Sequence, residues 1–300
     1  MASDQGVARR CDELRVTIAG ITTAIRSREP EINLGATGPT AKFVDQIAAP
    51  DINLDVRWGT PPAAGPGTLQ FDSGGVWQLY RDGERLVFRL SSPKFGPLPY
   101  KTATMATDFA SGIVHLHRPC FPSGVECYPL DYPLDELLLT NWLALGRGIE
   151  VHACAVVDRD GRAYLFAGHS GAGKTTMARQ WVGAPGVSVL SDDRVVVRNI
   201  DGRIWIYGTP WHGDEPLASP ARAQLTRVFF LEHAAANHVA AVGGATAAAK
   251  LFARSFPPFF SAGALDATLT ILSEIVQRVP FADFGFVPTR AVRQVVRDLG

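Results

Sequence analysis

The sequence predicts an α/β fold of the α+β type, with a mixed sheet, and three observations favour it. Residues 14–25 are rich in β-branched side chains, which is typical of strands. Residues 76–90 alternate around an Asp-Gly pair, as a β-hairpin does. After residue 133, strand-like and helix-like segments follow one another in a clear rhythm. We therefore expect a β-rich domain over residues 1–132 and an α/β domain over residues 133–300.

The N-terminal domain is expected to consist of strands with irregular connections. Residues 14–25 predict one or two strands, and Ile113–His117 predicts another. The stretch Gly59–Gly67 is crowded with Pro and Gly, which excludes regular structure there. In the expected hairpin, Asp82-Gly83 can supply the positive φ angles of a tight turn.

The C-terminal domain begins with an expected helix over residues 134–145, with Pro133 at its start. Strands follow over Val151–Val157 and Ala163–Ala167, joined by a short link that contains Asp160-Gly161. Because so short a link forces two strands to be antiparallel, we expect a mixed sheet. Residues 195–200 and 204–207 predict a hairpin across Asp201-Gly202. The other expected elements are a helix ending at Val182, strands over residues 187–190, 225–231 and 279–286, and helices over residues 244–254, 264–277 and 289–299.

Composition and charge narrow the class of protein. The 300 residues are 46% hydrophobic and 19% charged, which suits a chain with a folded core and not a disordered one. Lys and Arg total 29, as do Asp and Glu, and this balance disfavours nonspecific binding to nucleic acid. No apolar run reaches the ~18 residues that a membrane span needs, and the N-terminus holds no apolar signal segment. These features favour a cytoplasmic protein, as do four scattered cysteines: Cys11, Cys120, Cys127 and Cys154.

Residues 168–175, GHSGAGKT, match the phosphate-binding pattern G-x-x-x-x-G-K-[ST] in full. Small residues allow backbone N–H groups to surround phosphate oxygens, and the following helix points its positive end at the same anion. We expect Lys174 to place its charge on the outer phosphates and the Thr175 hydroxyl to bind Mg²⁺. A glycine turn without a ligand is disfavoured, because an apolar strand precedes the loop and a helical segment follows it. The residues expected to hold the nucleotide are Gly168, His169, Ser170, Gly171, Ala172, Gly173, Lys174, Thr175 and Thr176.

An acidic pair, Asp192 and Asp193, follows the apolar segment Val187–Leu190. Neighbouring side chains of an extended chain point in opposite directions, so the two carboxylates can do different jobs. One could hold Mg²⁺, and the other could accept the proton of an attacking hydroxyl. Acidic residues are also common in solvated turns, but the phosphate loop favours the functional interpretation.

Other side chains are candidates for the same site. His152 is either a core histidine, since apolar residues flank it, or a proton-transfer group beside the loop. The segment Gly208–Asp214 is either a tight turn or a means of bringing His212 and Asp214 to the substrate or to a second Mg²⁺. Candidate groups for stabilising transition-state charge are Arg222, Arg227 and Arg254. No metal-binding pattern fits the spacing of His115, His117, Cys120 and Cys127, so we favour coincidence there.

The ordered set of His152, GHSGAGKT and LSDDRVVV resembles the HPr kinase/phosphorylase family and its broader kin. The resemblance covers residues 148–215. It implies a nucleotide domain like that of phosphoenolpyruvate carboxykinase, with a mixed sheet, and ATP- and Mg²⁺-dependent phosphorylation of a serine hydroxyl. The family's Glu-Ile-Arg-Gly type segment is replaced here by Gly208–Asp214. The chain therefore resembles a divergent, stand-alone subgroup.

The resemblance also implies roles for this chain's residues. Lys174 would hold phosphates, and Thr175 and Asp193 would hold the metal. Proton transfer and metal positioning would fall to His152, Asp192 and Asp193.

We therefore expect a kinase that uses ATP and Mg²⁺ to phosphorylate a hydroxyl, with a serine of a peptide or protein favoured as acceptor. The N-terminal domain would recognise that acceptor or a partner. Two alternatives stay open: a nucleotide-dependent binding or regulatory module with little transfer activity, and a small-molecule kinase of the carboxykinase-like type. GTP in place of ATP also stays open, because the loop grips phosphates and not the base.

Overall fold

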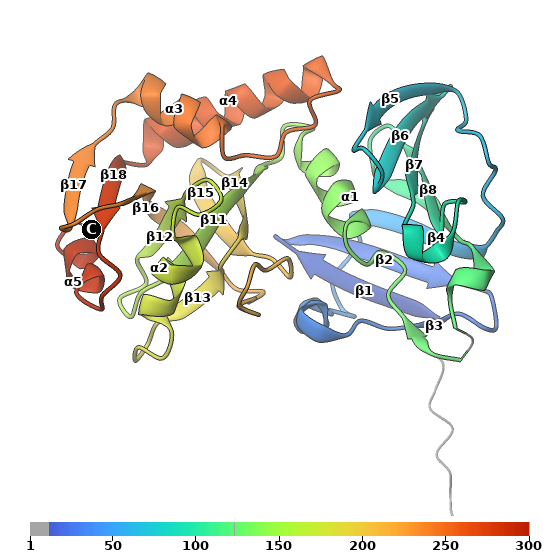
Figure 1. Ribbon diagram of the computed structural model, residues 1–300, viewed down its shortest axis with the longest axis horizontal. Coiled ribbons are helices and arrows are strands. Elements are labelled where there is room, and N and C mark those ends of the chain that lie inside the picture. Colours follow the sequence, from blue (N-terminus) through green and yellow to red (C-terminus); the bar gives the residue numbers. More distant parts are fainter. Residues whose placement is uncertain (1–11, 123, 300) are drawn as a thin grey trace, which may run out of the picture. The chain divides into compact units, whose positions relative to one another are not determined.

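The computed structural model describes residues 12–122 and 124–299 of the chain, so Cys11 lies outside it. The protein is a mixed α/β structure, built mostly from strands in mixed sheets together with helices (Figure 1). It divides into two compact units. The first runs to Leu134, and the second contains Asp135 onward together with the short segment Thr17–Gly20.

The first unit is organised around a large mixed sheet. Its strands lie in the order β1 (Glu13–Ile18), β2 (Ile21–Ser27), β4 (Ile52–Trp58), β9 (Ser111–Leu116), β8 (Lys101–Ala106), β7 (Arg85–Leu90), β6 (Trp77–Asp82) and β5 (Thr68–Asp72). In this order, β2–β4 and β4–β9 are parallel pairs, and every pair from β9–β8 to β6–β5 is antiparallel. Smaller elements are the strand pair β3 (Asn33–Leu34) and β10 (Glu126–Cys127), and 3-10 helices at Gly38–Phe43, Pro93–Phe95 and Arg118–Cys120.

Most of the strands predicted for this unit are confirmed. Residues 14–25 form β1 and β2, and Gly59–Gly67 contains no helix or strand. The hairpin of β6 and β7 is also confirmed, but its two-residue loop is Gly83-Glu84. The expectation that Asp82 has a positive φ is wrong, because Asp82 is the last paired residue of β6. Strands β4, β5 and β8 were not predicted.

The second unit holds the predicted succession of strands and helices. The elements are α1 (Leu134–Leu143), β11 (Ile149–Val157), β12 (Ala163–Ala167), α2 (Lys174–Trp181), β13 (Ser188–Ser191), β14 (Arg194–Ile200), β15 (Arg203–Gly208), β16 (Arg222–His233), β17 (His238–Ala241), α3 (Gly244–Phe252), α4 (Ala262–Arg278), β18 (Phe281–Phe286) and α5 (Val292–Arg297). Strands β11 and β12 are antiparallel while β12 and β16 are parallel, which confirms the mixed sheet.

Strand β11 changes partners midway, and this change positions the residues discussed below. Its first part pairs with β14, where His152 lies opposite Arg194. Its second part pairs with β12, where Ala153 lies opposite Ala167, and with β13. The end of β12, which leads into the glycine loop, therefore pairs with Ala153 of β11. The start of β14 pairs with the preceding residue, His152.

In the second unit, alternate residues of the strands contribute to two separate hydrophobic cores, because successive side chains of a strand point to opposite faces of the sheet. Leu165 and Phe230 face α3 and α4, while Phe166 and Phe229 face α2 and α5. The sheet is therefore covered by helices on both faces, which explains why its strands are continuously apolar.

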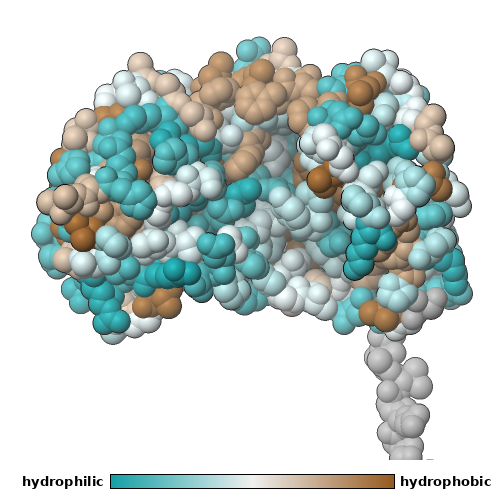
Figure 2. Space-filling model, viewed as in Figure 1, coloured by the Kyte–Doolittle hydropathy of each residue, from teal (hydrophilic) through white to brown (hydrophobic). Residues whose placement is uncertain are grey.

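The helices differ from the predictions mainly at their ends. Helix α5 is shorter than the expected 289–299, and β17 was not predicted. Figure 2 shows hydrophobic residues gathered over α3 and α4, where Leu269 of α4 is exposed. None of the helices formed by the described residues has the length and apolarity that a membrane crossing requires.

Candidate functional site

The phosphate-binding pattern forms the connection between β12 and α2. Gly171 and Gly173 have φ angles of 80° and 95°, in the left-handed region that favours glycine. A Cβ atom on Gly173 would also lie 2.8 Å from the ring of Phe286, and one on Gly168 would lie 2.6 Å from the Cβ of Ala172. The loop therefore needs glycine at these positions, for its backbone angles or for space.

The backbone N–H groups of this loop are largely free of protein acceptors. Gly168 and Ala172 donate to the carbonyls of His152 and His169. Within the described chain, the N–H groups of residues 169–171 and 173–176 donate no hydrogen bond. Helix α2 begins at the end of the same loop, so its dipole adds positive charge there. An array of free donors at a helix N-terminus suits a phosphate group.

Lys174 carries a buried positive charge that the nearby protein groups neutralise only in part. Its side chain is only 6% exposed; its Nζ donates to the His169 carbonyl at 3.3 Å and lies 4.0 Å from Asp193 Oδ1. Burial lowers the pKa of Lys174 below its usual value, although the Asp193 charge opposes this shift. An anion beside the ammonium group would stabilise it, which is the chemistry of a phosphate ligand.

Asp192 is fully buried, and its position is fixed by three donors. The Thr175 hydroxyl donates to Oδ2 at 3.3 Å. The backbone N–H of Gly213 donates to Oδ1 at 3.0 Å, and that of Glu215 donates to Oδ2 at 3.3 Å. The carboxylate therefore lies beside the first turn of α2, next to the hydroxyl that the sequence assigned to Mg²⁺.

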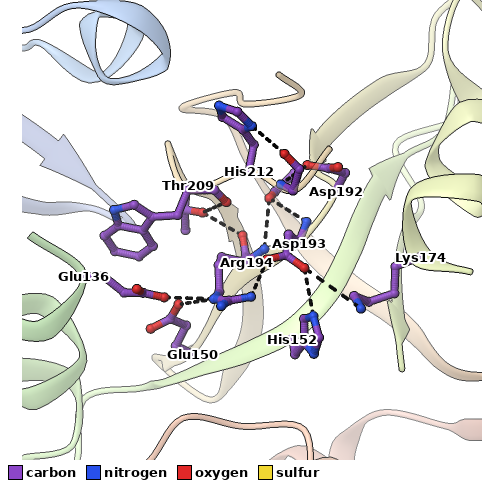
Figure 3. Close-up of polar contacts among 12 residues, drawn as sticks. Glu136, Glu150, His152, Lys174, Asp192, Asp193, Arg194, Thr209 and His212 are labelled. Atoms are coloured by element: carbon purple, nitrogen blue, oxygen red, sulfur yellow. Dashed lines mark hydrogen bonds and ion pairs between the residues drawn. The ribbon is translucent and has the colours of Figure 1, made fainter. Parts of the chain in front are cut away.

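Asp193 has different partners, as alternation along the chain predicts (Figure 3). Its Oδ1 lies 2.8 Å from His152 Nε2, and its Oδ2 accepts from Arg194. Burial by itself would raise the pKa of Asp193, but the hydrogen bond to His152 and the charges of Arg194 and Lys174 outweigh it and lower that pKa. The carboxyl group is therefore ionised at neutral pH, and part of it is exposed to solvent.

Arg194 completes the cluster, and the sequence analysis did not single it out. Its Nε donates to Glu136 at 2.8 Å and lies 3.5 Å from Glu150 Oε1. The Phe256 ring lies against its guanidinium, 4.3 Å from the ring centre. One signal was available, because Arg194 stands directly between the acidic pair and the apolar run Val195–Val197.

Glu150 is a buried acid behind this cluster. Its side chain is fully buried, and Thr140 Oγ1 donates to Oε2 at 2.6 Å. Burial and the nearby charge of Glu136 raise the pKa of Glu150 well above its usual value, and Arg194 offsets only part of that shift. Glu150 therefore keeps its proton to a higher pH than a surface glutamate does.

The structure brings together most of the predicted site, though not all of it. His152, Lys174, Thr175, Asp192 and Asp193 lie in one cluster, to which loop glycines contribute backbone. His169 and Ser170 are exposed in the loop, and Thr176 is half-buried. Both substrate candidates are exposed: His212, whose Nδ1 faces the Gly213 carbonyl, and Asp214.

The side chains of the three candidate arginines donate to groups other than the acidic pair, although the backbone carbonyl of Arg254 accepts from the His152 N–H at 2.7 Å. Arg222 donates to the hydroxyl of Tyr207, and Arg227 donates to the carbonyl of Leu299. The side chain of Arg254 donates to the Lys250 carbonyl. Arg194 is the arginine that contacts the acidic pair.

His233 is a second residue that the sequence analysis missed. It ends β16, and its Nε2 lies 2.8 Å from the carbonyl of Gly171 in the loop. Its ring stacks on Phe286, with 6.1 Å between ring centres. Nothing in the local sequence marks this contact, because the parallel pairing of β16 with β12 creates it.

The donors present fit Mg²⁺ together with a phosphate ligand. Mg²⁺ is usually held by one or two carboxylates plus phosphate oxygens and water. Asp192 and the adjacent Thr175 hydroxyl supply such hard oxygen donors. Among the described residues, no group of three or more His, Cys, Asp and Glu side chains is arranged to hold a metal ion, and this includes the region of His115 and Cys120.

Neither a protein-family model nor a curated protein sequence matches this chain.

Proposed function

We propose that the protein is a kinase that transfers the γ-phosphoryl group of ATP, with Mg²⁺, to a hydroxyl group, and that the acceptor is a serine of a peptide or protein. The observation that carries this proposal is the 4.0 Å distance between Lys174 Nζ and Asp193 Oδ1. At that point a phosphate-binding cation and an ionised carboxylate meet. Phosphoryl transfer needs little more than such positioning and charge.

The phosphates of the nucleotide would be held by the loop. The free N–H groups of residues 169–171 and 173–176 donate to phosphate oxygens, and Lys174 supplies charge to the outermost phosphate. His233 braces the loop through the Gly171 carbonyl and leaves the N–H groups of the loop facing the ligand.

Asp192 and Thr175 would hold the metal. This assignment differs from the one that the resemblance implies, which gives the metal to Asp193, because Asp192 is the carboxylate in contact with the Thr175 hydroxyl. Mg²⁺ held there would supply positive charge that offsets the negative charge of the nucleotide's phosphates. The N–H groups of Gly213 and Glu215 keep the Asp192 carboxylate oriented for that role.

Asp193 would act as the base. As the acceptor oxygen bonds to the γ-phosphorus, its proton passes to Asp193 Oδ1. The bond between the γ-phosphorus and the β–γ bridging oxygen breaks, and ADP leaves. His152 hydrogen-bonds to the same Oδ1 and stabilises the ionised carboxylate before the transfer.

We further propose that the second unit is a nucleotide domain of the HPr kinase and carboxykinase-like type. The antiparallel pairing of β11 with the loop-bearing strand β12 supports this assignment. In the commoner parallel P-loop fold, helical crossovers join the strands.

The direct test combines binding with product analysis. Isothermal calorimetry measures the affinity for Mg-ATP, and mass spectrometry follows label from γ-labelled ATP into a library of serine peptides. We expect Asp193→Asn to bind ATP normally and to transfer the phosphoryl group about 100-fold more slowly or worse, the usual cost of losing a general base.

Asp192→Asn should instead raise the Mg²⁺ concentration needed for half-maximal activity. Asp201→Asn, in an exposed hairpin turn, is the matched control and should behave as wild type. Full transfer activity in Asp193→Asn would rule out the proposed base.

A further inference from the structure

Arg194 reaches carboxyl groups from separate parts of the second unit. Its guanidinium contacts Glu136 in the first turn of α1, Glu150 on β11 and Asp193 beside it in the chain. The face of the guanidinium lies against the Phe256 ring. The group is therefore held along its edges and on one face, with only 18% of the side chain exposed.

The two oxygens of Asp193 are divided between different partners. Oδ2 accepts from Arg194, while Oδ1 faces His152 at 2.8 Å and Lys174 at 4.0 Å. His152 and Arg194 are cross-strand neighbours on β11 and β14, so they reach the carboxylate from adjacent strands. A carboxylate without the Arg194 contact could rotate and present either oxygen to the loop.

We propose that Arg194 is a positioning residue, which fixes Asp193 so that Oδ1 faces the phosphate loop, and that Glu136 holds Arg194 in place. This inference rests on the proposed function, in which Oδ1 takes the proton of the acceptor. Arg194 acts through Asp193 and touches neither ATP nor the acceptor. Its hydrogen bond engages Oδ2, so Oδ1, the oxygen on the side of Lys174, is the one that receives the proton.

The shape of arginine suits this role better than its charge alone. A guanidinium is a planar fork whose N–H groups can bind two carboxylates at fixed angles. Lysine offers a point charge on a flexible stem and cannot hold Glu136 and Asp193 in the same plane. Replacement of Arg194 by lysine therefore separates geometry from charge.

The kinetic test uses three variants and Mg-ATP, with ADP release measured with water or a serine peptide as acceptor. We expect Arg194→Lys to lower kcat about 100-fold, as a misplacement of ~1 Å does, with little change in KM for ATP. Glu136→Gln should lower kcat about 10-fold, the loss typical of a supporting hydrogen bond. Arg203→Met, at an exposed position of β15, should behave as wild type.

The double variant Arg194→Lys/Glu136→Gln tests whether the two residues act in series. If Glu136 acts through Arg194, the double variant loses no more activity than Arg194→Lys alone. Independent losses that add would overturn that part of the inference.

A second measurement needs no nucleotide. The NMR signal of the His152 ring proton Hε1 reports whether Asp193 Oδ1 still faces the imidazole. We expect Arg194→Lys to move that signal toward its position in Asp193→Asn, and Arg203→Met to leave it in place. An unmoved signal, or a kcat for Arg194→Lys close to wild type, would overturn the inference.

Failure of the proposed function has a different signature. Calorimetry would then detect no binding of Mg-ATP to the wild-type protein. The His152 signal would still respond to Arg194→Lys, because that contact exists without nucleotide.

Discussion

Oppositely charged side chains meet around Asp193, and their ionisation sets how the site responds to pH. Two cations and an imidazole surround one ionised carboxylate, while burial and the charge of Glu136 raise the pKa of a second carboxyl group, Glu150, behind them. Lys174 is the least compensated member, because burial is not matched by a close anion. Each of these environments predicts a measurable effect.

The lowered pKa of Asp193 predicts a loss of stability in acid. As pH falls below 3.8, the usual value, the unfolded chain takes up a proton before the folded protein does, so folding weakens as pH falls through the pKa of the folded state. At neutral pH the carboxylate contributes about 2 kcal/mol through its charged hydrogen bonds. Urea unfolding at pH 7 and at pH 3 should therefore show a deficit for Asp193→Asn at pH 7 that shrinks at pH 3. A deficit that is equal at both pH values would contradict this account.

Lys174→Met should separate stability from function. Removing a poorly compensated buried cation in favour of an apolar side chain of similar length should leave the free energy of unfolding unchanged or raise it by about 1 kcal/mol. The same change removes the charge that we propose binds phosphate, so the increase in Tm that we expect Mg-ATP to produce in the wild type should disappear. Thermal unfolding with and without Mg-ATP measures both effects. A destabilised variant that still gains stability from Mg-ATP would refute both expectations.

Among the elements, the hairpin of β14 and β15 shows how local chemistry places distant groups. Its loop is Asp201-Gly202, with φ angles of 53° and 76°, as a type I′ turn requires. This turn fixes the register of β14 against β15, with Ile200 opposite Arg203. The other edge of β14 pairs with β11, where Arg194 lies opposite His152.

Substitutions in this turn should change stability in a predictable order. Gly202→Ala puts a side chain where φ is 76°, in otherwise open space, and should cost about 1 kcal/mol from backbone strain alone. Asp201→Asn keeps a residue that tolerates positive φ and should be neutral or slightly stabilising. Denaturant titration of the two variants checks the order. Equal stabilities would show that the turn does not limit the stability of the hairpin.

At the scale of the whole molecule, the two compact units differ in chemistry. The phosphate loop, the acidic pair and Arg194 all belong to the second unit, which has its own two cores. In the described part of the first unit, a large sheet carries no such loop. Nucleotide binding should therefore slow hydrogen exchange in the second unit and not in the first.

Hydrogen exchange should reveal that difference. With saturating Mg-ATP, we expect slower exchange in peptides that cover residues 163–182 and 188–215, because these segments contain the loop, Asp192 and its donors. Peptides from β6 and β7 should exchange at the same rate with and without nucleotide. AMP, which lacks the outer phosphates, is the control ligand. Protection confined to β6 and β7 would contradict the proposed location of the site.

Sequence patterns were sufficient for the features that depend on neighbouring residues. The loop match identified Lys174, the short link identified the antiparallel pairing of β11 with β12, and the Asp-Gly pair at 201–202 identified a hairpin. In each case the physical cause lies within a few residues, in a turn, a backbone angle or the length of a connection. The Asp82-Gly83 turn was predicted one residue out of place, because strand pairing and not composition decides where a hairpin turns.

The sequence by itself therefore identified the glycine loop that carries Lys174, the acidic pair and the mixed character of the sheet. Tertiary structure alone decided which carboxylate stands beside Thr175, that Arg194 joins Asp193 to Glu136, and that His233 supports the loop. These contacts join residues far apart in the chain, and they arise where β11 changes partners and where β16 pairs with β12. Local pattern cannot reveal them, because a side chain's partner across a sheet is set by register, and register is settled only when the whole sheet forms.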